Sequence, residues 1–302
     1  MDLRQLRYFA AVAREGQITA AAKKLNMEQP PLSRQMKQLE EEMGTALFDR
    51  SGRRLALTEA GQRLYERSEE LFVRFEETML EIRELGEGSG GTLSIGAVVS
   101  CVSLLPGAIE RFSRGYPGVG FKIQGGDHFQ LAELLRRRRI ELILARLPFE
   151  APHGADDYIV APLPNDPLAV AVPASWTEYA GRDSIGLGEL ADRPFLTLKT
   201  DLTTGMHERI MLEFGERGVQ PDVFCECSSV SVILALIAQG LGVSLLPRSV
   251  LDSLRPEGCR MLELENAELQ PDVGVIWLRG RYLSKSAERF IAELRHRPGG
   301  SA

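Results

Sequence analysis

Polar, basic and proline residues cluster near the start of this 302-residue chain, and their types suit contacts with DNA. In the major groove, arginine and lysine can bind guanine, glutamine can bind adenine, and short apolar surfaces can meet the methyl group of thymine. Serine hydroxyls and the N–H groups at the start of a helix suit phosphate oxygens. The sequence therefore predicts DNA contacts by Thr19, Gln29, Pro30, Pro31, Ser33, Arg34 and Lys37.

Two short helices joined by a tight turn are predicted to position these side chains. Apolar residues recur at helical spacing from Ile18 to Leu25 and again from Leu32 to Leu39. Residues 26–28 break the pattern, and the two prolines that follow fit the first turn of a helix, where a missing N–H costs little. The polar residues then lie away from the buried stripe, as the recognition helix of a helix-turn-helix requires.

A β-hairpin, or wing, is predicted after the second helix. Two short extended runs flank a Ser-Gly turn pair within residues 47–58. The basic residues of this segment can reach the DNA backbone or a narrow minor groove. They are Arg50, Arg53 and Arg54. A solvated basic loop is the alternative, but the helix pair before it favours contact with DNA.

These N-terminal residues closely resemble the DNA-binding domain of LysR-type transcriptional regulators. The resemblance lies in the runs Ala20–Leu25, Gln29–Gln35, Leu47–Arg50 and Leu57–Gly61, together with Leu39-Glu40. Glu28 departs from the family, which usually has serine or threonine as the cap of the recognition helix, and glutamate caps less well. The resemblance implies a winged helix-turn-helix over residues 1–58 that binds promoter DNA, with RNA polymerase as a further partner.

A long amphipathic helix is predicted over residues 59–86, with Thr58 as its cap. One apolar stripe runs along an otherwise charged helix, which favours pairing with a second helix. The stripe, predicted to form the dimer contact, comprises Leu64, Leu71, Phe75, Met79 and Ile82. Packing on its own domain is the alternative, but the resemblance implies a homodimer through an antiparallel coiled coil, or a homotetramer of two such dimers. The glycine-rich residues 87–91 are predicted to be a hinge.

The rest of the chain alternates strand and helix patterns, which predicts an α/β fold with parallel sheets. The pattern divides into lobe I, residues 92–165 and 266–302, and lobe II, residues 166–265. Short motifs at 104–106, 116–117 and 240–247 are similar to those of the LysR effector-binding region. This resemblance implies two Rossmann-like lobes, as in periplasmic substrate-binding proteins, with a small-molecule effector in the cleft between them.

The effector is expected where strand ends and helix starts of both lobes converge. Carried over by position from the family, the two walls comprise Ser100, Cys101, Asp127 and His128 from lobe I, and Lys199, Thr200, Thr203, Thr204, Ser228 and Ser229 from lobe II. Hydroxyls, exposed N–H groups and a lysine favour a small carboxylate or another small anion.

Alternatives stay open for several of these residues. The two serines can merely cap a helix, and the Thr-Thr pair can form only a turn. His128 stands where many relatives carry serine or threonine, so the resemblance does not transfer the identity of the ligand. Arg146 and Glu226 resemble charged positions of relatives that respond to aromatic acids, although a structural ion pair is the favoured interpretation.

Composition and charge limit the other function classes. The chain is 44% hydrophobic and 26% charged, no apolar run reaches membrane-spanning length, and its first residues do not begin a signal peptide, so a cytoplasmic protein is expected. The net charge is −6, yet residues 1–60 carry 10 Lys and Arg against 8 Asp and Glu, so contact with DNA must be local. No nucleophile with its base, metal cluster or cofactor loop is evident, so neither an enzyme nor a cofactor is predicted. An exported solute-binding protein would carry a signal peptide and no helix-turn-helix.

The cysteines suggest an alternative signal for the same regulator. All four, Cys101, Cys225, Cys227 and Cys259, are expected to be reduced thiols in a chain of this kind. Oxidation of Cys101 with Cys225 or Cys227 would replace effector binding as the switch.

Overall fold

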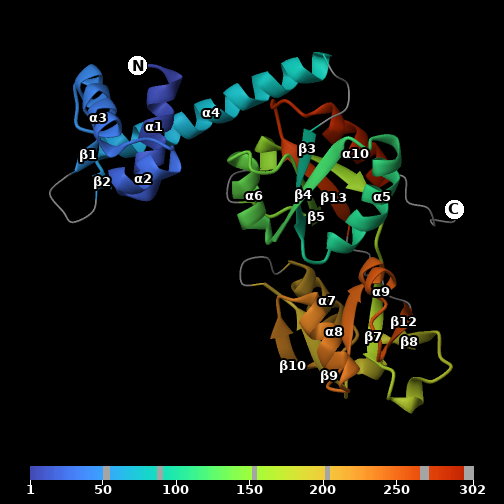
Figure 1. Cartoon of the computed structure of the whole chain (residues 1–302). Helices are drawn as coiled ribbons and strands as arrows, with labels where there is room; N and C mark the ends of the chain where they lie inside the picture. Colours follow the sequence, from blue (N-terminus) through green and yellow to red (C-terminus); the bar gives the residue numbers. More distant parts are fainter. Residues whose placement is uncertain (50–54, 87–90, 152–154, 201–204, 266–271, 296–302) are drawn as a thin grey trace. The chain divides into compact units, whose positions relative to one another are not determined.

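The computed structural model describes residues 1–49, 55–86, 91–151, 155–200, 205–265 and 272–295, which belong to two compact units, Met1–Ile82 and Arg83–Ala302 (Figure 1). No helix among these residues is both long and apolar enough to cross a membrane. The first unit is largely helical and the second consists of two α/β lobes, so the predicted fold class is confirmed.

The first unit contains the predicted helix pair and the strands of the wing. Its elements are α1 (Leu3–Glu15), α2 (Ile18–Lys24), α3 (Gln29–Met43), β1 (Phe48–Asp49), β2 (Ala56–Leu57) and α4 (Glu59–Gly86). Asp2 caps α1 by accepting a hydrogen bond from the backbone N–H of Gln5 at 2.7 Å. Phe9, Leu32 and Met36 are fully buried in the core that holds the helices together. The apolar spacing seen in the sequence therefore builds this core.

Lobe I is a five-stranded sheet with helices on both faces. Its elements are β3 (Gly91–Val98), η1 (Val102–Leu104), α5 (Leu105–Gly115), β4 (Val119–Gly126), α6 (His128–Arg136), β5 (Leu142–Arg146), η2 (Ala155–Asp157), β6 (Tyr158–Leu163), β13 (Val273–Leu278) and α10 (Lys285–Arg295). The strand order is β4-β3-β5-β13-β6. Figure 1 shows α6 on one side of the sheet and α5 with α10 on the other. The rings of Phe112, Phe121 and Phe290 pack against one another between sheet and helices, with centroids 5.4–5.6 Å apart.

The sheets are mixed rather than parallel, which corrects the expectation from the sequence. In lobe I, β3 pairs in parallel with β4 and β5, but β13 is antiparallel to both β5 and β6. The chain passes from β6 to lobe II and returns to lobe I as β13. A strand that returns from another lobe does not follow the helix crossover that makes consecutive strands parallel.

Lobe II is built around the buried strand β7. The elements of the lobe are β7 (Leu168–Pro173), η3 (Thr177–Tyr179), β8 (Ser184–Gly186), η4 (Leu187–Leu190), β9 (Pro194–Leu198), α7 (Gly205–Glu216), β10 (Asp222–Cys227), α8 (Val230–Ala238), β11 (Ser244–Pro247), α9 (Arg248–Leu254) and β12 (Cys259–Glu265). Val170 and Val172 of β7 pack on one face with Phe214 of α7, whereas Ala169 and Ala171 pack on the other face with α8 and α9. One four-stranded sheet has the order β11-β7-β12-β8, and β9 pairs with β10.

A close backbone contact at Gly242 joins the two sheets of lobe II. The N–H of Val243 donates to the carbonyl of Pro194 at 2.9 Å, and the N–H of Leu196 donates to the carbonyl of Val243 at 2.8 Å. A Cβ atom on residue 242 would lie 2.3 Å from the carbonyl oxygen of Pro194. Only glycine therefore allows β9 to reach the strand that leads into β11.

Gly242→Ala should destabilise lobe II. The added methyl group forces the two backbones apart, and we expect a loss of about 2 to 4 kcal/mol in the free energy of unfolding, from overpacking and backbone strain. Calorimetry of the full chain measures the change. Gly188→Ala is the matched control, because a Cβ there meets no atom within 4 Å. Equal melting temperatures for the two variants would contradict this account of Gly242.

Candidate functional site

The second helix of the helix-turn-helix, α3, exposes the predicted DNA-binding side chains on the side opposite its buried stripe. Gln29, Pro30, Arg34 and Lys37 are exposed, as is Thr19 on α2. Pro31 and Ser33 are half-buried. Leu32, Met36 and Leu39 are fully buried on the other side of α3. One helix face is thus available for a DNA groove.

Arg34 is the strongest candidate for a base contact among these residues. Among the described residues it has no ion-pair partner, whereas Lys37 lies 3.7 Å from Glu41 in an exposed pair. A guanidinium group can donate two parallel hydrogen bonds to one guanine. Arg34 is therefore free to make such a contact without breaking an internal one.

The start of α3 offers few N–H donors for a phosphate group. Glu28 is the N-cap residue, but its side chain makes no capping hydrogen bond. Pro30 and Pro31 carry no N–H group. This helix start consequently presents an apolar proline surface, suited to a thymine methyl group or to the shape of the backbone, more than a set of phosphate donors.

The wing arginines Arg50, Arg53 and Arg54 lie outside the described residues. The strands before and after this segment are present: β1 and β2 pair antiparallel, with Phe48 opposite Leu57 and Asp49 opposite Ala56.

The apolar stripe of α4 divides into two parts. Leu64 is half-buried against the core of its own unit. The other four stripe residues are exposed large hydrophobic side chains: Leu71 at 44%, Phe75 at 42%, Met79 at 37% and Ile82 at 57%. Packing on its own unit therefore applies to Leu64, and the dimer contact stays a prediction for the four exposed residues.

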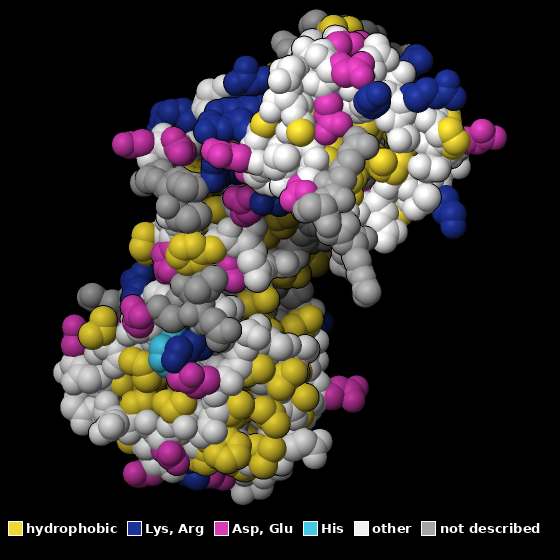
Figure 2. All heavy atoms as spheres, turned by 90° about the vertical axis from the view of Figure 1, so that its left-hand side faces the viewer, with side chains coloured by type: hydrophobic (Ala, Val, Ile, Leu, Met, Phe, Trp, Pro, Cys, Tyr) yellow, Lys and Arg dark blue, Asp and Glu magenta, His cyan; other side chains and the backbone are white. Residues whose placement is uncertain are grey.

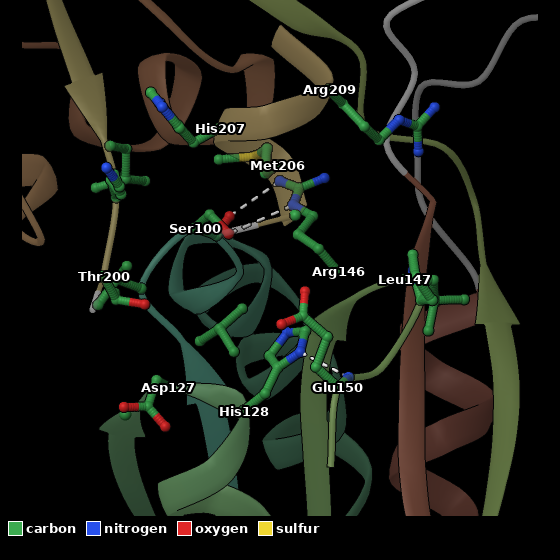
Figure 3. Close-up of a pocket in the computed structure, with 17 residues that line it drawn as sticks. Ser100, Asp127, His128, Arg146, Leu147, Glu150, Thr200, Met206, His207 and Arg209 are labelled. Atoms are coloured by element: carbon green, nitrogen blue, oxygen red, sulfur yellow. Dashed lines mark hydrogen bonds between the residues drawn. The ribbon is translucent and has the colours of Figure 1, made fainter. Parts of the chain in front are cut away.

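A pocket lies between the two lobes of the second unit (Figure 3). It contains about 640 Å³ of space not filled by atoms, including solvent at its mouth. Apolar side chains form much of the lining: Val98, Val99, Leu147, Leu198 and Met206. Polar groups come from strand ends and helix starts: Ser100, Asp127, His128, Arg146, Glu150, Lys199, Thr200, His207 and Arg209.

Arg146 is held in a buried network where the chain crosses between lobes. Its Nη2 donates to Asp166 Oδ2 at 2.7 Å and to the carbonyl of Ser100 at 3.0 Å. Asp166 also accepts from the N–H and the hydroxyl of Ser249, at 3.1 and 2.6 Å. Arg146 and Asp166 are 5% and 1% exposed. The charge of Arg146 is thus matched by the protein itself.

His128 is neutral at physiological pH. The side chain is 2% exposed, and burial lowers the pKa of His128 to about 4. Its Nδ1 accepts a hydrogen bond from the backbone N–H of Glu150 at 3.0 Å, so the remaining ring proton sits on Nε2. The ring also lies 5.1 Å from that of Phe149. His128 therefore fixes the loop after β5 rather than presenting a positive charge.

Lys199 pairs with Glu226 on the lobe II side of the pocket. The distance from Nζ to Oε1 is 2.8 Å, and Lys199 holds the pKa of Glu226 below its usual value. His207 Nδ1 lies 2.8 Å from the hydroxyl of Thr197, and burial together with Lys199 lowers the pKa of His207. Figure 2 shows a histidine next to basic and acidic side chains on lobe II, with hydrophobic side chains around them. Arg146 and Glu226 thus each form an ion pair, but not with one another.

The structure brings only part of the predicted effector wall together. Ser100, Asp127, His128, Lys199 and Thr200 line the pocket. Cys101 does not line the pocket; it is fully buried in the core of lobe I. Ser228 and Ser229 do not line the described pocket; Ser229 precedes α8 without capping it by its side chain. Thr203 and Thr204 lie outside the described residues.

Several lining residues were not predicted from the sequence. Glu150 follows β5 in a loop, and Gly205, Met206 and Arg209 belong to the first turns of α7. The helix start at residue 205 was a usable signal, because ligands often bind at such ends. The local sequence contains no signal that Glu150 lines the pocket, because its side chain contacts Gly205 of lobe II, far along the chain.

The cysteines are free thiols in separate parts of the second unit. Cys101 belongs to the core of lobe I, whereas Cys225 and Cys227 lie on β10 of lobe II and pack against its core. A disulfide between the lobes would require the buried Cys101 to leave its core.

Two family models match the chain. One, described as a bacterial regulatory helix-turn-helix protein of the lysR family, matches residues 3–62, and the other, described as a LysR substrate binding domain, matches residues 86–299.

Individual proteins are similar over nearly the whole chain. The transcriptional regulator BsdA of Bacillus subtilis is 33% identical over 96% of this chain and 99% of its own length. The uncharacterized regulator YybE of the same organism is 31% identical over 96% and 97%. The crystal structure of full-length CbnR complexed with its target DNA has a TM-score of 0.73 and 23% identity, covers 98% and 99% of the two chains, and supports the fold alone.

The helix-turn-helix geometry, the α/β lobes and these matches agree. The chain belongs to the LysR family and is a DNA-binding transcriptional regulator rather than an enzyme.

Proposed function

We propose that this regulator is controlled by a small carboxylate, or a similar small anion, bound in the pocket between the two lobes. The observation that carries the proposal is the pocket itself, whose lining comes from strand ends of lobe I and from β9 and α7 of lobe II. A ligand that contacts both lobes favours the arrangement in which both contacts are made. The protein then responds by a shift between arrangements of its parts.

The lining favours a carboxylate with an apolar body. Lys199, Thr200 and the N–H groups at the start of α7 supply donors for an anionic group. The valine, leucine and methionine side chains around them suit hydrocarbon. Arg146 is already neutralised by Asp166 and is assigned a positioning role.

The first unit is assigned the contact with promoter DNA. We propose that residues 1–58 form the DNA-binding domain, with α3 in the major groove and the wing against the backbone or minor groove. Residues 59–86 pair two chains, and residues 92–302 bind the effector and transmit its signal, with RNA polymerase as a further partner. A dimer, or a tetramer of two dimers, would place recognition helices on spaced half-sites.

Arg34→Ala should weaken binding to the promoter. A footprint on the DNA upstream of the chain's own gene, taken over a salt series, should show spaced protected half-sites whose occupancy falls as salt rises. Loss of the guanidinium should reduce affinity by about tenfold or more at fixed salt. Arg67→Ala, which removes an exposed arginine of α4 paired with Glu70, is the control and should change little. Equal footprints for both variants would overturn the assignment of α3.

Phe75→Glu should separate the dimer. Phe75 is 42% exposed on the apolar stripe of α4, and a buried charge at a helix pair is costly. Sedimentation of the full chain should show the wild type as a dimer or tetramer and the variant as smaller species. Arg74→Glu, a change at the exposed neighbouring position, is the control. An unchanged assembly in Phe75→Glu would place the dimer contact elsewhere.

Lys199→Ala should weaken effector binding. Titration calorimetry with a panel of small carboxylates identifies a ligand, and loss of the ammonium group should lower its affinity by about tenfold, the size of one charged hydrogen bond. Thr200→Val tests the hydroxyl in the same way. Ser228→Ala, outside the pocket lining, should have no effect. If every binding signal survives Lys199→Ala and Thr200→Val unchanged, the proposed wall does not bind the ligand.

A further inference from the structure

A carboxylate of the chain itself lies inside the pocket. Glu150 follows β5 on lobe I, and its side chain accepts a hydrogen bond from the backbone N–H of Gly205, the first residue of α7 on lobe II. A Cβ atom on residue 205 would lie 2.7 Å from Oε1 of Glu150. Figure 3 shows the Glu150 side chain beside His128 among the residues that line the pocket. Glycine at position 205 thus leaves the space that this carboxylate occupies.

The backbone of Glu150 is held firmly on lobe I. Its N–H donates to Nδ1 of the buried, neutral His128 at 3.0 Å. The preceding Phe149 packs against His128 and against Tyr158, with ring centroids 5.1 and 5.4 Å apart. One residue therefore has its main chain fixed to lobe I and its carboxylate on lobe II.

The start of α7 is suited to a carboxylate, whether it belongs to Glu150 or to the proposed effector. Its N–H groups are not used within the helix, and the helix dipole places partial positive charge there. Two basic residues of the lining are already paired, Lys199 with Glu226 and Arg146 with Asp166. Arg209, in the first turns of α7, also lines the pocket and is exposed. An anion entering the pocket can therefore also gain from the Gly205 amide, which Glu150 now occupies.

We infer that Glu150 is an internal competitor of the effector: its carboxylate occupies the place of the effector's anionic group at the start of α7 and joins the lobes until the effector displaces it. The inference rests on the proposed function, because it requires an anionic effector in this pocket. Two carboxylates cannot share this place without strong repulsion. Burial already raises the pKa of Glu150, as expected of a carboxylate in a partly desolvated position.

Competition also selects the class of effector. A bare carboxylate gains at α7 only what Glu150 loses there. A carboxylate with an apolar body gains in addition the contacts with Val98, Leu198 and Met206 in the lining, which Glu150 does not provide. The effector class is therefore a small carboxylate with a hydrocarbon or aromatic body, and an uncharged amide of the same shape should not displace Glu150.

The test compares three variants of the full chain. Glu150→Ala removes the competitor, and Glu150→Gln removes its charge but keeps an acceptor oxygen. Glu208→Gln is the matched control. Glu208 is exposed on α7, raises the pKa of Glu150 by its charge, and does not line the pocket. Calorimetry with acetate, butyrate, benzoate and benzamide measures binding. Amide hydrogen exchange of residues 205–207 without ligand measures the contact between the lobes.

The expected result is a gain of affinity on removal of Glu150. Benzoate should bind Glu150→Ala about tenfold more tightly than wild type, the size of one charged hydrogen bond no longer to be broken. Glu150→Gln should show a smaller gain, and Glu208→Gln should stay within about twofold of wild type. Acetate should bind more weakly than benzoate, and benzamide should gain nothing. The amides of residues 205–207 should exchange faster in Glu150→Ala.

Other outcomes separate this inference from the proposed function. If wild type binds a carboxylate and Glu150→Ala binds it no more tightly, the competitor role is overturned while the effector class stands. If no carboxylate binds to wild type or to any variant, both are overturned. Unchanged exchange at residues 205–207, or an equal gain in Glu208→Gln, would also overturn the occupation of the α7 start by Glu150.

Discussion

The buried ion pair of Arg146 and Asp166 ties the end of β5 in lobe I to the segment that leads into lobe II. A guanidinium group removed from water must have its charge and donors matched, and here a carboxylate and two carbonyl groups do so. Arg146 lies at the end of β5, and Asp166 lies between β6 and β7, where the chain crosses from lobe I to lobe II. Ser249 at the start of α9 donates a further hydrogen bond to the carboxylate of Asp166. Removing one member of such a pair typically costs about 3 to 5 kcal/mol. The contact between Arg146 and Asp166 is therefore costly to break.

The opposite side of the pocket is held by weaker contacts. Glu150 of lobe I reaches Gly205 of lobe II by a single described hydrogen bond, whereas the Lys199–Glu226 pair lies within lobe II and does not join the lobes. One partly exposed hydrogen bond contributes much less than the buried ion pair. In the proposed mechanism, a ligand of modest affinity can therefore replace the Glu150 contact without breaking the pair of Arg146 and Asp166. In the proposed mechanism, an anion that binds at the start of α7 replaces Glu150 as the partner of the Gly205 amide.

Local pattern was sufficient to predict most elements of the fold. The helix pair around residues 26–28 followed from apolar spacing and two prolines, and the strands β3, β4 and β5 from short apolar runs. The same reasoning failed for features that depend on contacts between residues far apart in the sequence. The antiparallel β13 depends on the chain's return from lobe II, and Glu150 reaches the pocket only because α7 begins opposite it. The turn after β3 shows how little separates the two outcomes: Ser100 lines the pocket, whereas the next residue, Cys101, belongs to the core.

The α4 helix shows why periodicity alone cannot assign a partner. The residues of its stripe all lie on one face of the helix by their spacing. Leu64 nevertheless packs on its own unit, while Leu71, Phe75 and Met79 are exposed. A pattern states which face is apolar, but not what covers it. Four exposed large side chains along one helix face are more than scattered surface hydrophobics, and covering each would contribute about 1 kcal/mol or more. In the proposed dimer, that gain would come from the pairing of two chains through this face of α4.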